Sequence, residues 1–128
     1  MTAQKVQWRM RRSTLRNLAV SKSELLMTLD NGAVVALDQN TGTEVWSQPL
    51  LIGRGVTNPI AISGSKFCAV GDYQGYVYVM DLGTGELIGR GRVRGGAILT
   101  TFVSPVFEGF YTLSERGMIT AWPLKEGG

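Results

Sequence analysis

A repeat of about 43 residues constrains the fold of this chain more than any other feature. Residues 36–46 read Ala-Leu-Asp-Gln-Asn-Thr-Gly-Thr-Glu-Val-Trp, and the same skeleton returns at residues 79–89 as Val-Met-Asp-Leu-Gly-Thr-Gly-Glu-Leu-Ile-Gly. Three turn glycines keep a matching spacing of 43 and then 42 residues, namely Gly32, Gly75 and Gly117. A period of this length indicates a repeat architecture, in which each unit buries its apolar face against the next one.

Short runs of β-branched and aromatic residues fill each period, and no helical periodicity competes with them. The runs predict strands at residues 17–20, 24–29, 33–38 and 43–48, then at 59–63, 66–71, 76–81 and 86–92, and finally at 99–104, 109–113 and 118–122. Four short antiparallel strands in each period of 40-odd residues are typical of a propeller blade. The sequence therefore predicts an all-β fold, a partial β-propeller of about three four-stranded blades whose last blade is incomplete.

We expect a single propeller fragment over residues 1–128. Residues 5–10 end close to Trp8 in the way that residues 43–48 contain Trp46, so they predict the last strand of a preceding blade. The predicted divisions are residues 5–16 for that strand and its loop, 17–48 and 59–92 for two blades, and 99–124 for a terminal three-stranded blade.

The repeated motif predicts a structural contact between blades rather than a reaction centre. The Asp38 carboxylate can accept N–H bonds from the turn that follows it, and Gly42 can adopt a backbone conformation that other residues resist. Trp46 offers a large apolar face to a neighbouring blade and one N–H that needs an acceptor. The structural motif residues are Ala36, Asp38, Thr41, Gly42 and Trp46, with Asp81, Thr84 and Gly85 in the second copy, where Gly89 replaces the tryptophan. No catalytic, cofactor-binding or metal-binding residue is predicted.

One turn prediction and two compositional features complete the reading from residues alone. Asp30-Asn31-Gly32 predicts a type I′ hairpin turn, because Asn and Gly accept a positive φ. The chain has no histidine, which removes the commonest general base and makes a zinc site improbable. Its single cysteine, Cys68, lies in an apolar run and predicts a buried strand thiol. We expect neither a signal peptide in residues 1–5 nor a segment that spans a membrane.

Residues 36–46 match Ala-x-Asp-x-x-Thr-Gly-x-x-x-Trp at every fixed position, and this pattern resembles the tryptophan-docking motif of the quinoprotein-like, or PQQ-type, propeller repeat. Within that superfamily, Thr57-Asn58-Pro59 and residues 70–81 are similar to a passage near the C-terminus of the BamB family. Asn58 and Gln74 stand where that family more often has serine and glutamate.

The resemblance implies that the chain is the C-terminal part of an eight-bladed propeller lipoprotein on the periplasmic side of the bacterial outer membrane. It implies a non-enzymatic interaction scaffold that helps to assemble outer-membrane proteins, with no cofactor, and whose partner is the POTRA region of the barrel-assembly protein BamA. The resemblance supplies no partner-contact residue. Arg54 and Arg94, in loops between blades, can contact a partner or can be ordinary solvated charges.

Two other functions stay open at this point. The chain can be a fragment of a PQQ-dependent dehydrogenase, which shares the repeat but needs a cluster of oxygen ligands for Ca²⁺, a catalytic Asp and a stacking platform. The candidate carboxylates are few and are mostly assigned to turns: Asp30, Asp38, Asp72 and Asp81. The basic run Arg9, Arg11, Arg12 and Arg16 can bind nucleic acid, although a net charge of only +3 favours a solvated loop.

The third predicted blade has no fourth strand, so its last strand presents an unpaired edge, which is an association hazard. We therefore expect the isolated chain to form homo-oligomers. One route has residues 6–10 of one copy completing the terminal blade of the next copy.

Overall fold

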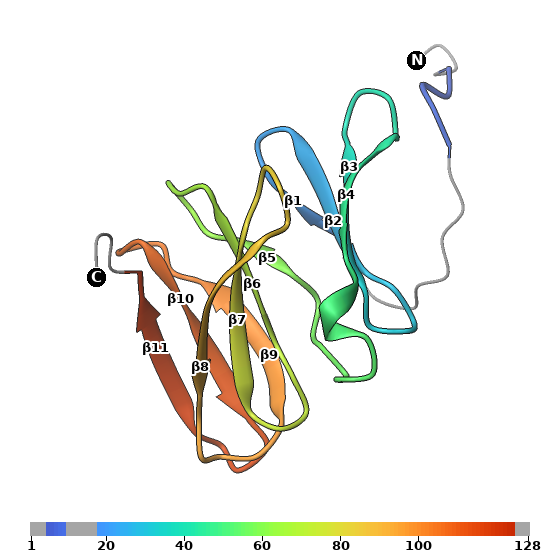
Figure 1. Ribbon diagram of the computed structural model, residues 1–128. Coiled ribbons are helices and arrows are strands. Elements are labelled where there is room, and N and C mark those ends of the chain that lie inside the picture. The colour runs from blue at the N-terminus through green and yellow to red at the C-terminus, as the bar shows by residue number, and fades with distance from the viewer. Residues whose placement is uncertain (1–4, 10–17, 125–128) are drawn as a thin grey trace.

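The chain folds into three antiparallel β-sheets that stand side by side (Figure 1), and the prediction of an all-β partial propeller is confirmed. A computed structural model describes residues 5–9 and 18–124. The first sheet contains β1 (Ala19–Val20), β2 (Glu24–Thr28), β3 (Val34–Asp38) and β4 (Glu44–Gln48). The second contains β5 (Ile60–Ala61), β6 (Phe67–Gly71), β7 (Tyr76–Asp81) and β8 (Leu87–Arg92). The third contains β9 (Ile98–Val103), β10 (Gly109–Ser114) and β11 (Ile119–Pro123).

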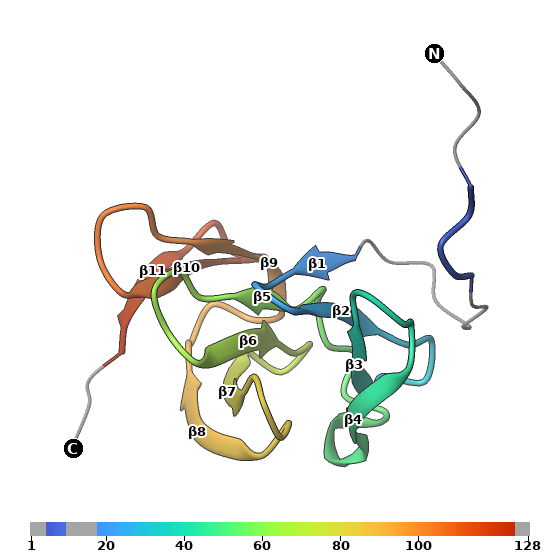
Figure 2. The same cartoon turned by 90° about the horizontal axis from the view of Figure 1, so that it is seen from above.

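Each sheet is a meander in which strands adjacent in sequence are hydrogen-bonded neighbours. The first strands of the three sheets, β1, β5 and β9, lie next to one another, and the sheets fan outward from them when seen from above (Figure 2). This arrangement is that of consecutive blades in a propeller. A short 3₁₀ helix, η1 (Pro49–Leu51), begins the connection from the first sheet to the second.

The repeat in the sequence is also present in the pairing register of the strands. In the first sheet the pairing of β3 with β4 is shifted between Ala36 and Leu37, and in the second the pairing of β7 with β8 is shifted between Val79 and Met80. The two irregularities fall at equivalent motif positions. A bulge increases the local twist of a strand, so in both sheets the outer strand, β4 or β8, is twisted at the same place just after the motif turn.

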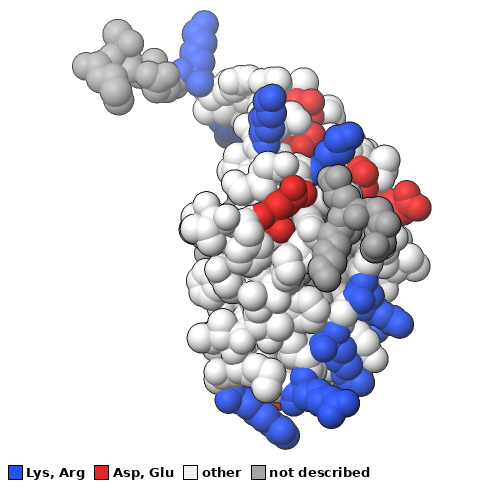
Figure 3. All heavy atoms as spheres, turned by 90° about the vertical axis from the view of Figure 1, so that its left-hand side faces the viewer, with Lys and Arg blue, Asp and Glu red and all other residues white. Residues whose placement is uncertain are grey.

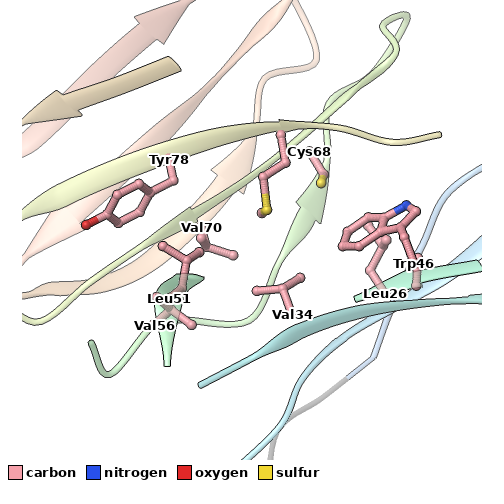
Figure 4. Packing of buried hydrophobic residues seen from close by; sticks show 10 residues of the cluster. Leu26, Val34, Trp46, Leu51, Val56, Cys68, Val70 and Tyr78 are labelled. Atoms are coloured by element: carbon pink, nitrogen blue, oxygen red, sulfur yellow. The ribbon is translucent and has the colours of Figure 1, made fainter. Parts of the chain in front are cut away.

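The apolar core lies between the sheets rather than within any one of them. One cluster joins the first two sheets, and in it Leu26, Val34 and Trp46 face Cys68, Val70 and Tyr78 across the interface (Figure 4). A second cluster joins the second and third sheets and includes Ala69, Val77, Ile98 and Phe110. A single blade cannot bury its apolar residues alone, so the blades stabilise one another.

Residues 5–9 form no strand within the described chain. That residues 5–10 are the last strand of a preceding blade stays a prediction, because such a strand pairs with its own blade and not with the sheets described here. Met10 and the predicted loop through residue 16 lie outside the described residues, as do Asn17 and three of the four arginines of the basic run. The alternation of polar and apolar residues in this segment indicated a strand, but no described residue pairs with it.

The hairpin turns correct one prediction. Gly32 has φ of 99° and its N–H donates to the Leu29 carbonyl at 2.9 Å, whereas Asn31 has a negative φ. A type I′ turn needs a positive φ at both central residues, so the prediction of that type was wrong. The loop is instead a three-residue connection in which a glycine in the left-handed region follows a tight turn. Gly75 and Gly117 repeat it, with φ of 91° and 76°.

Candidate functional site: tryptophan clasps between the blades

The Asp38 turn closes on its own carboxylate. Asp38 Oδ1 accepts hydrogen bonds from the N–H groups of Asn40 at 2.7 Å and Thr41 at 3.1 Å. The Gly42 N–H donates to the Asp38 carbonyl at 2.8 Å, and Gly42 has φ of 75°. A short acidic side chain is suited to this position, because it satisfies turn donors that no strand partner reaches.

The second copy of the motif has the same geometry almost bond for bond. Asp81 Oδ1 accepts from the N–H groups of Gly83 at 2.7 Å and Thr84 at 3.1 Å. The Gly85 N–H donates to the Asp81 carbonyl at 2.8 Å, with φ of 77° at Gly85. Both motif carboxylates are therefore engaged by the backbone, which leaves them a structural role.

Trp46 connects the first copy of the motif to the second. Its indole lies on Gly85 so closely that a methyl group at Gly85 would overlap the ring. The N–H that requires an acceptor donates to the Leu82 carbonyl at 2.7 Å, and Gln48 Nε2 donates to the Gly85 carbonyl at 2.8 Å. Trp46 is 7% exposed. Gly85 serves two purposes here: it adopts the positive φ of the turn, and it lacks the Cβ that would overlap the indole.

Trp8 makes the same contact one unit earlier. Its ring covers Gly42, and its Nε1 donates to the Gln39 carbonyl at 2.8 Å. Gln7 Nε2 also donates to the Asn40 carbonyl at 3.0 Å. The sequence indicated that Trp8 and Trp46 occupy equivalent positions, but not that Trp8 reaches the turn of residues 38–42. The contact therefore forms without the strand that was predicted around Trp8.

The junction of the second and third sheets is built differently. Gly89, which occupies the tryptophan position of the second motif, has open space around its missing Cβ, with only Val79 Cβ at 4.0 Å. The tryptophan at this junction comes instead from the third sheet. Trp122 lies over Gly91, with Cζ3 2.6 Å from where a Cβ of Gly91 would be. It stacks on Phe110 with a centroid separation of 6.1 Å, and its Nε1 donates to Thr112 Oγ1 at 3.0 Å.

A buried carboxylate organises the turn between β6 and β7. Asp72 is fully buried, and its Oδ1 accepts from the N–H groups of Gln74 and Tyr76, each at 2.9 Å. Its Oδ2 accepts from the Tyr78 hydroxyl at 2.7 Å. Burial, followed by the bond to Asp72, raises the pKa of Tyr78 to about 12. Arg54 Nη1 donates to the same hydroxyl at 3.3 Å, so the network reaches the surface at Arg54.

Cys68 is the buried strand thiol that the sequence predicted, with no exposed surface. Burial in the first interface raises its pKa to about 12, and the charges of Asp81 and Glu24 add to the effect. Since the thiolate is the reactive form, this side chain has the properties of a packing residue and not those of a nucleophile.

The described residues contain no group of three or more His, Cys, Asp or Glu side chains placed to hold a metal ion. The four carboxylates considered for a cofactor site do not converge, because Asp38, Asp72 and Asp81 each serve a separate turn. Among the described residues, no helix is long and apolar enough to cross a membrane.

Three sheets joined by tryptophan-on-glycine contacts define a segment of a β-propeller of the quinoprotein-like type. The sequence is similar to BamB proteins, the outer membrane protein assembly factors. The Legionella pneumophila (strain Paris) protein is 35% identical over 112 residues, 88% of this chain and 28% of the relative. The Xanthomonas campestris protein is 36% identical over 108 residues, 84% of this chain and 26% of the relative. The resemblance to the C-terminal part of a BamB propeller is therefore confirmed over most of this chain.

Solved structures agree with this assignment. The crystal structure of BamB from Moraxella catarrhalis matches 91% of this chain and 34% of its own length, with a TM-score of 0.80 and 29% identity. The WD40 domain of SCAP from fission yeast matches with a TM-score of 0.65 at 14% identity, which shows the propeller fold alone. No protein-family model matches the chain. The names of the relatives describe an assembly factor and not a dehydrogenase, and the chain spans only about a quarter of their length.

Proposed function

We propose that this chain is a non-enzymatic protein-interaction scaffold that acts, like the BamB proteins, in the assembly of outer-membrane proteins. The observation that carries the proposal is the similarity to BamB over 88% of the chain, together with the Moraxella catarrhalis structure. The clasp geometry supports it, because the motif's carboxylates and indoles are used between blades. The dehydrogenase alternative has no such support.

The proposed partner is the POTRA region of a BamA-type protein, and the proposed location is the periplasmic side of the outer membrane. Both come from the resemblance to BamB. The test is to immobilise the purified POTRA region and to measure binding of the chain by biolayer interferometry. A saturable response that free chain competes away is expected. No binding by a chain with native circular dichroism contradicts the proposed partner.

A titration separates the scaffold from the dehydrogenase alternative. The chain is mixed with PQQ and Ca²⁺, and the quinone absorption spectrum is followed. The scaffold predicts the spectrum of free quinone at every protein concentration. A defined spectral change that saturates at one equivalent favours the enzyme.

We also propose that isolated copies associate through an edge strand. Among the described strands β11 pairs only with β10, and Ile119 on this strand is 74% exposed. An unpaired edge with apolar side chains is a template for another strand. Light scattering at micromolar concentration is expected to show a mass above that of one chain, and Ile119→Lys is expected to lower it. A monodisperse monomer contradicts this proposal and leaves the scaffold role untouched.

A further inference from the structure

Five exposed arginines gather at the hairpin end of the second and third sheets. Arg54 and Arg90 line one hollow of about 450 Å³ between the first and second sheets. Arg92, Arg94 and Arg116 line another of about 660 Å³ between the second and third. We call this set the arginine rim. In Figure 3, Lys and Arg side chains gather toward one end of the face, where almost no Asp or Glu side chain is seen, and further Lys and Arg side chains lie among the Asp and Glu side chains toward the other end. One end of this face is thus basic although the net charge of the chain is only +3.

Several guanidinium groups of the rim are held in place before any partner arrives. The Cζ atoms of Arg90 and Arg92 lie 5.2 and 4.7 Å from the centroid of the Tyr76 ring. Arg92 Nε also donates to the Gln74 carbonyl at 3.3 Å. Arg54 is bonded to the Tyr78 hydroxyl, which is anchored on Asp72. Side chains that are already ordered lose less conformational entropy on binding.

The side-chain contacts described for the rim arginines are to uncharged groups, namely the Tyr76 ring, the Gln74 carbonyl and the hydroxyls of Tyr76 and Tyr78. Two carboxylates lie near the rim: Glu115 Oε1 accepts from the Ala97 N–H at 3.2 Å, and Asp72 lies behind Arg54, bridged to it by the Tyr78 hydroxyl. The exposed guanidinium groups of the other four arginines are open to a ligand or to solvent.

The hollow beside Arg54 and Arg90 adds an apolar component. Leu50 on η1 is 67% exposed at its edge, and Leu51, Leu87 and the Tyr78 ring complete the lining. Gly89 opens this hollow, because the docking tryptophan of the first motif has no counterpart there. Apolar side chains next to fixed guanidinium groups suit a ligand that carries carboxylates and aliphatic side chains close together.

We infer that the arginine rim binds an acidic protein segment, with a leucine-type side chain in the hollow beside Leu50 and carboxylates on the guanidinium groups. This inference rests on the proposed scaffold function and names the chemistry of a partner for it. A protein segment fits better than a nucleic acid, because Arg90 and Arg92 cover the Tyr76 ring on which a base would stack. Two concave hollows fit side chains better than they fit a membrane surface.

The test uses a short fluorescein-labelled peptide rich in glutamate with spaced leucines, and fluorescence anisotropy measures its Kd. The charge-reversal variant R92E/R94E/R116E is expected to weaken binding by about tenfold or more, since each carboxylate loses its partner and meets a like charge. The matched control K5E/K22E/K66E makes the same change in net charge elsewhere on the exposed surface and is expected to change Kd by less than about twofold. Circular dichroism and the Tm verify that each variant is folded.

Other outcomes overturn the inference. They are absence of peptide binding, equal weakening by the control variant, and tighter binding of a DNA duplex or of phosphatidylglycerol vesicles than of the peptide. If charge reversal prevents folding, R94Q/R116Q replaces it, because both side chains are exposed and the change only removes their charge. Charge-reversal variants that lose peptide binding but bind the POTRA region normally support this inference and leave the proposed function intact. POTRA binding without any peptide binding refutes this inference alone.

Discussion

The two junctions between blades are built from the same repeat and yet are filled from opposite sides. Between the first and second sheets, the earlier blade supplies Trp46 and the later blade supplies a glycine that receives it. Between the second and third sheets, the earlier blade supplies Gly91 and the later blade supplies Trp122. A blade repeat therefore specifies that an indole must meet a glycine at the junction, but it does not specify which blade carries the indole.

Removing the two docking tryptophans is expected to give the largest and most unequal effects. Trp46→Ala should lower the free energy of unfolding by about 3–5 kcal/mol, because it empties a buried site and leaves the Leu82 carbonyl without its donor. Trp8→Ala is the matched control, since the same bond is lost but Trp8 is only half-buried. It should cost about 1–2 kcal/mol. Urea unfolding followed by circular dichroism measures both. Equal losses contradict the comparison.

A methyl group on the receiving glycine tests the other half of the clasp. Gly85→Ala should cost about 2–4 kcal/mol, because Cβ overlaps the Trp46 ring and the backbone has φ of 77°. Gly64→Ala is the control, with φ of 75° and no atom within 4 Å of the added Cβ. It should cost only about 1 kcal/mol, which is the backbone contribution alone. Thermal and urea unfolding of the two variants show whether the difference is present.

Alkaline pH should weaken the first junction selectively. Cys68 and Tyr78 both belong to its core, and burial raises the pKa of each to about 12 from ordinary values of 9.0 and 10.0. The fold favours the neutral forms, so their contribution is complete below pH 9 and is lost as the pH rises toward 12. The loss should be on the order of several kcal/mol, most of it from Cys68.

Urea unfolding at a series of pH values measures that loss. Cys68→Ala together with Tyr78→Phe should flatten the profile between pH 9 and 12, whatever its cost at neutral pH. A profile that keeps its slope in the double variant contradicts the assignment of the titrating groups.

The smallest effect is expected at the glycine where the repeat lacks its tryptophan. Gly89→Ala should change stability by less than about 1 kcal/mol, because its Cβ meets only Val79 at 4.0 Å. Gly91→Ala, two residues along the same strand, should cost about 1–3 kcal/mol, because Trp122 occupies that space. Urea unfolding of these two variants shows which blade supplies the tryptophan at the junction of the second and third sheets. The reverse order of the two effects contradicts that location.

The sequence predicts much of the fold because the repeat fixes the strand period and the turn glycines. It also identifies Asp38, Gly42 and Trp46, since a reversing turn needs a local acceptor and a permissive backbone. It does not predict that Trp8 reaches the turn of residues 38–42, because that contact depends on how units pack and not on sequence alternation. It misses the contact of Trp122 with Gly91, since that contact joins two blades outside the motif. The sequence also does not reveal the arginine rim as a group. Its members come together only when the blades are stacked, so Arg54 and Arg94 could be named from their loops but not Arg90, Arg92 and Arg116.

A double-mutant cycle between Trp46 and Gly85 tests the clasp most directly. Unfolding free energies are measured for the original chain, Trp46→Ala, Gly85→Ala and the double variant. Without the indole, the methyl group at residue 85 has nothing to overlap. The double variant should therefore lose less unfolding free energy than the two single variants lose together, by about 1 kcal/mol or more. If the two losses add to within about 0.5 kcal/mol, the tryptophan and the glycine do not act together and the clasp is contradicted.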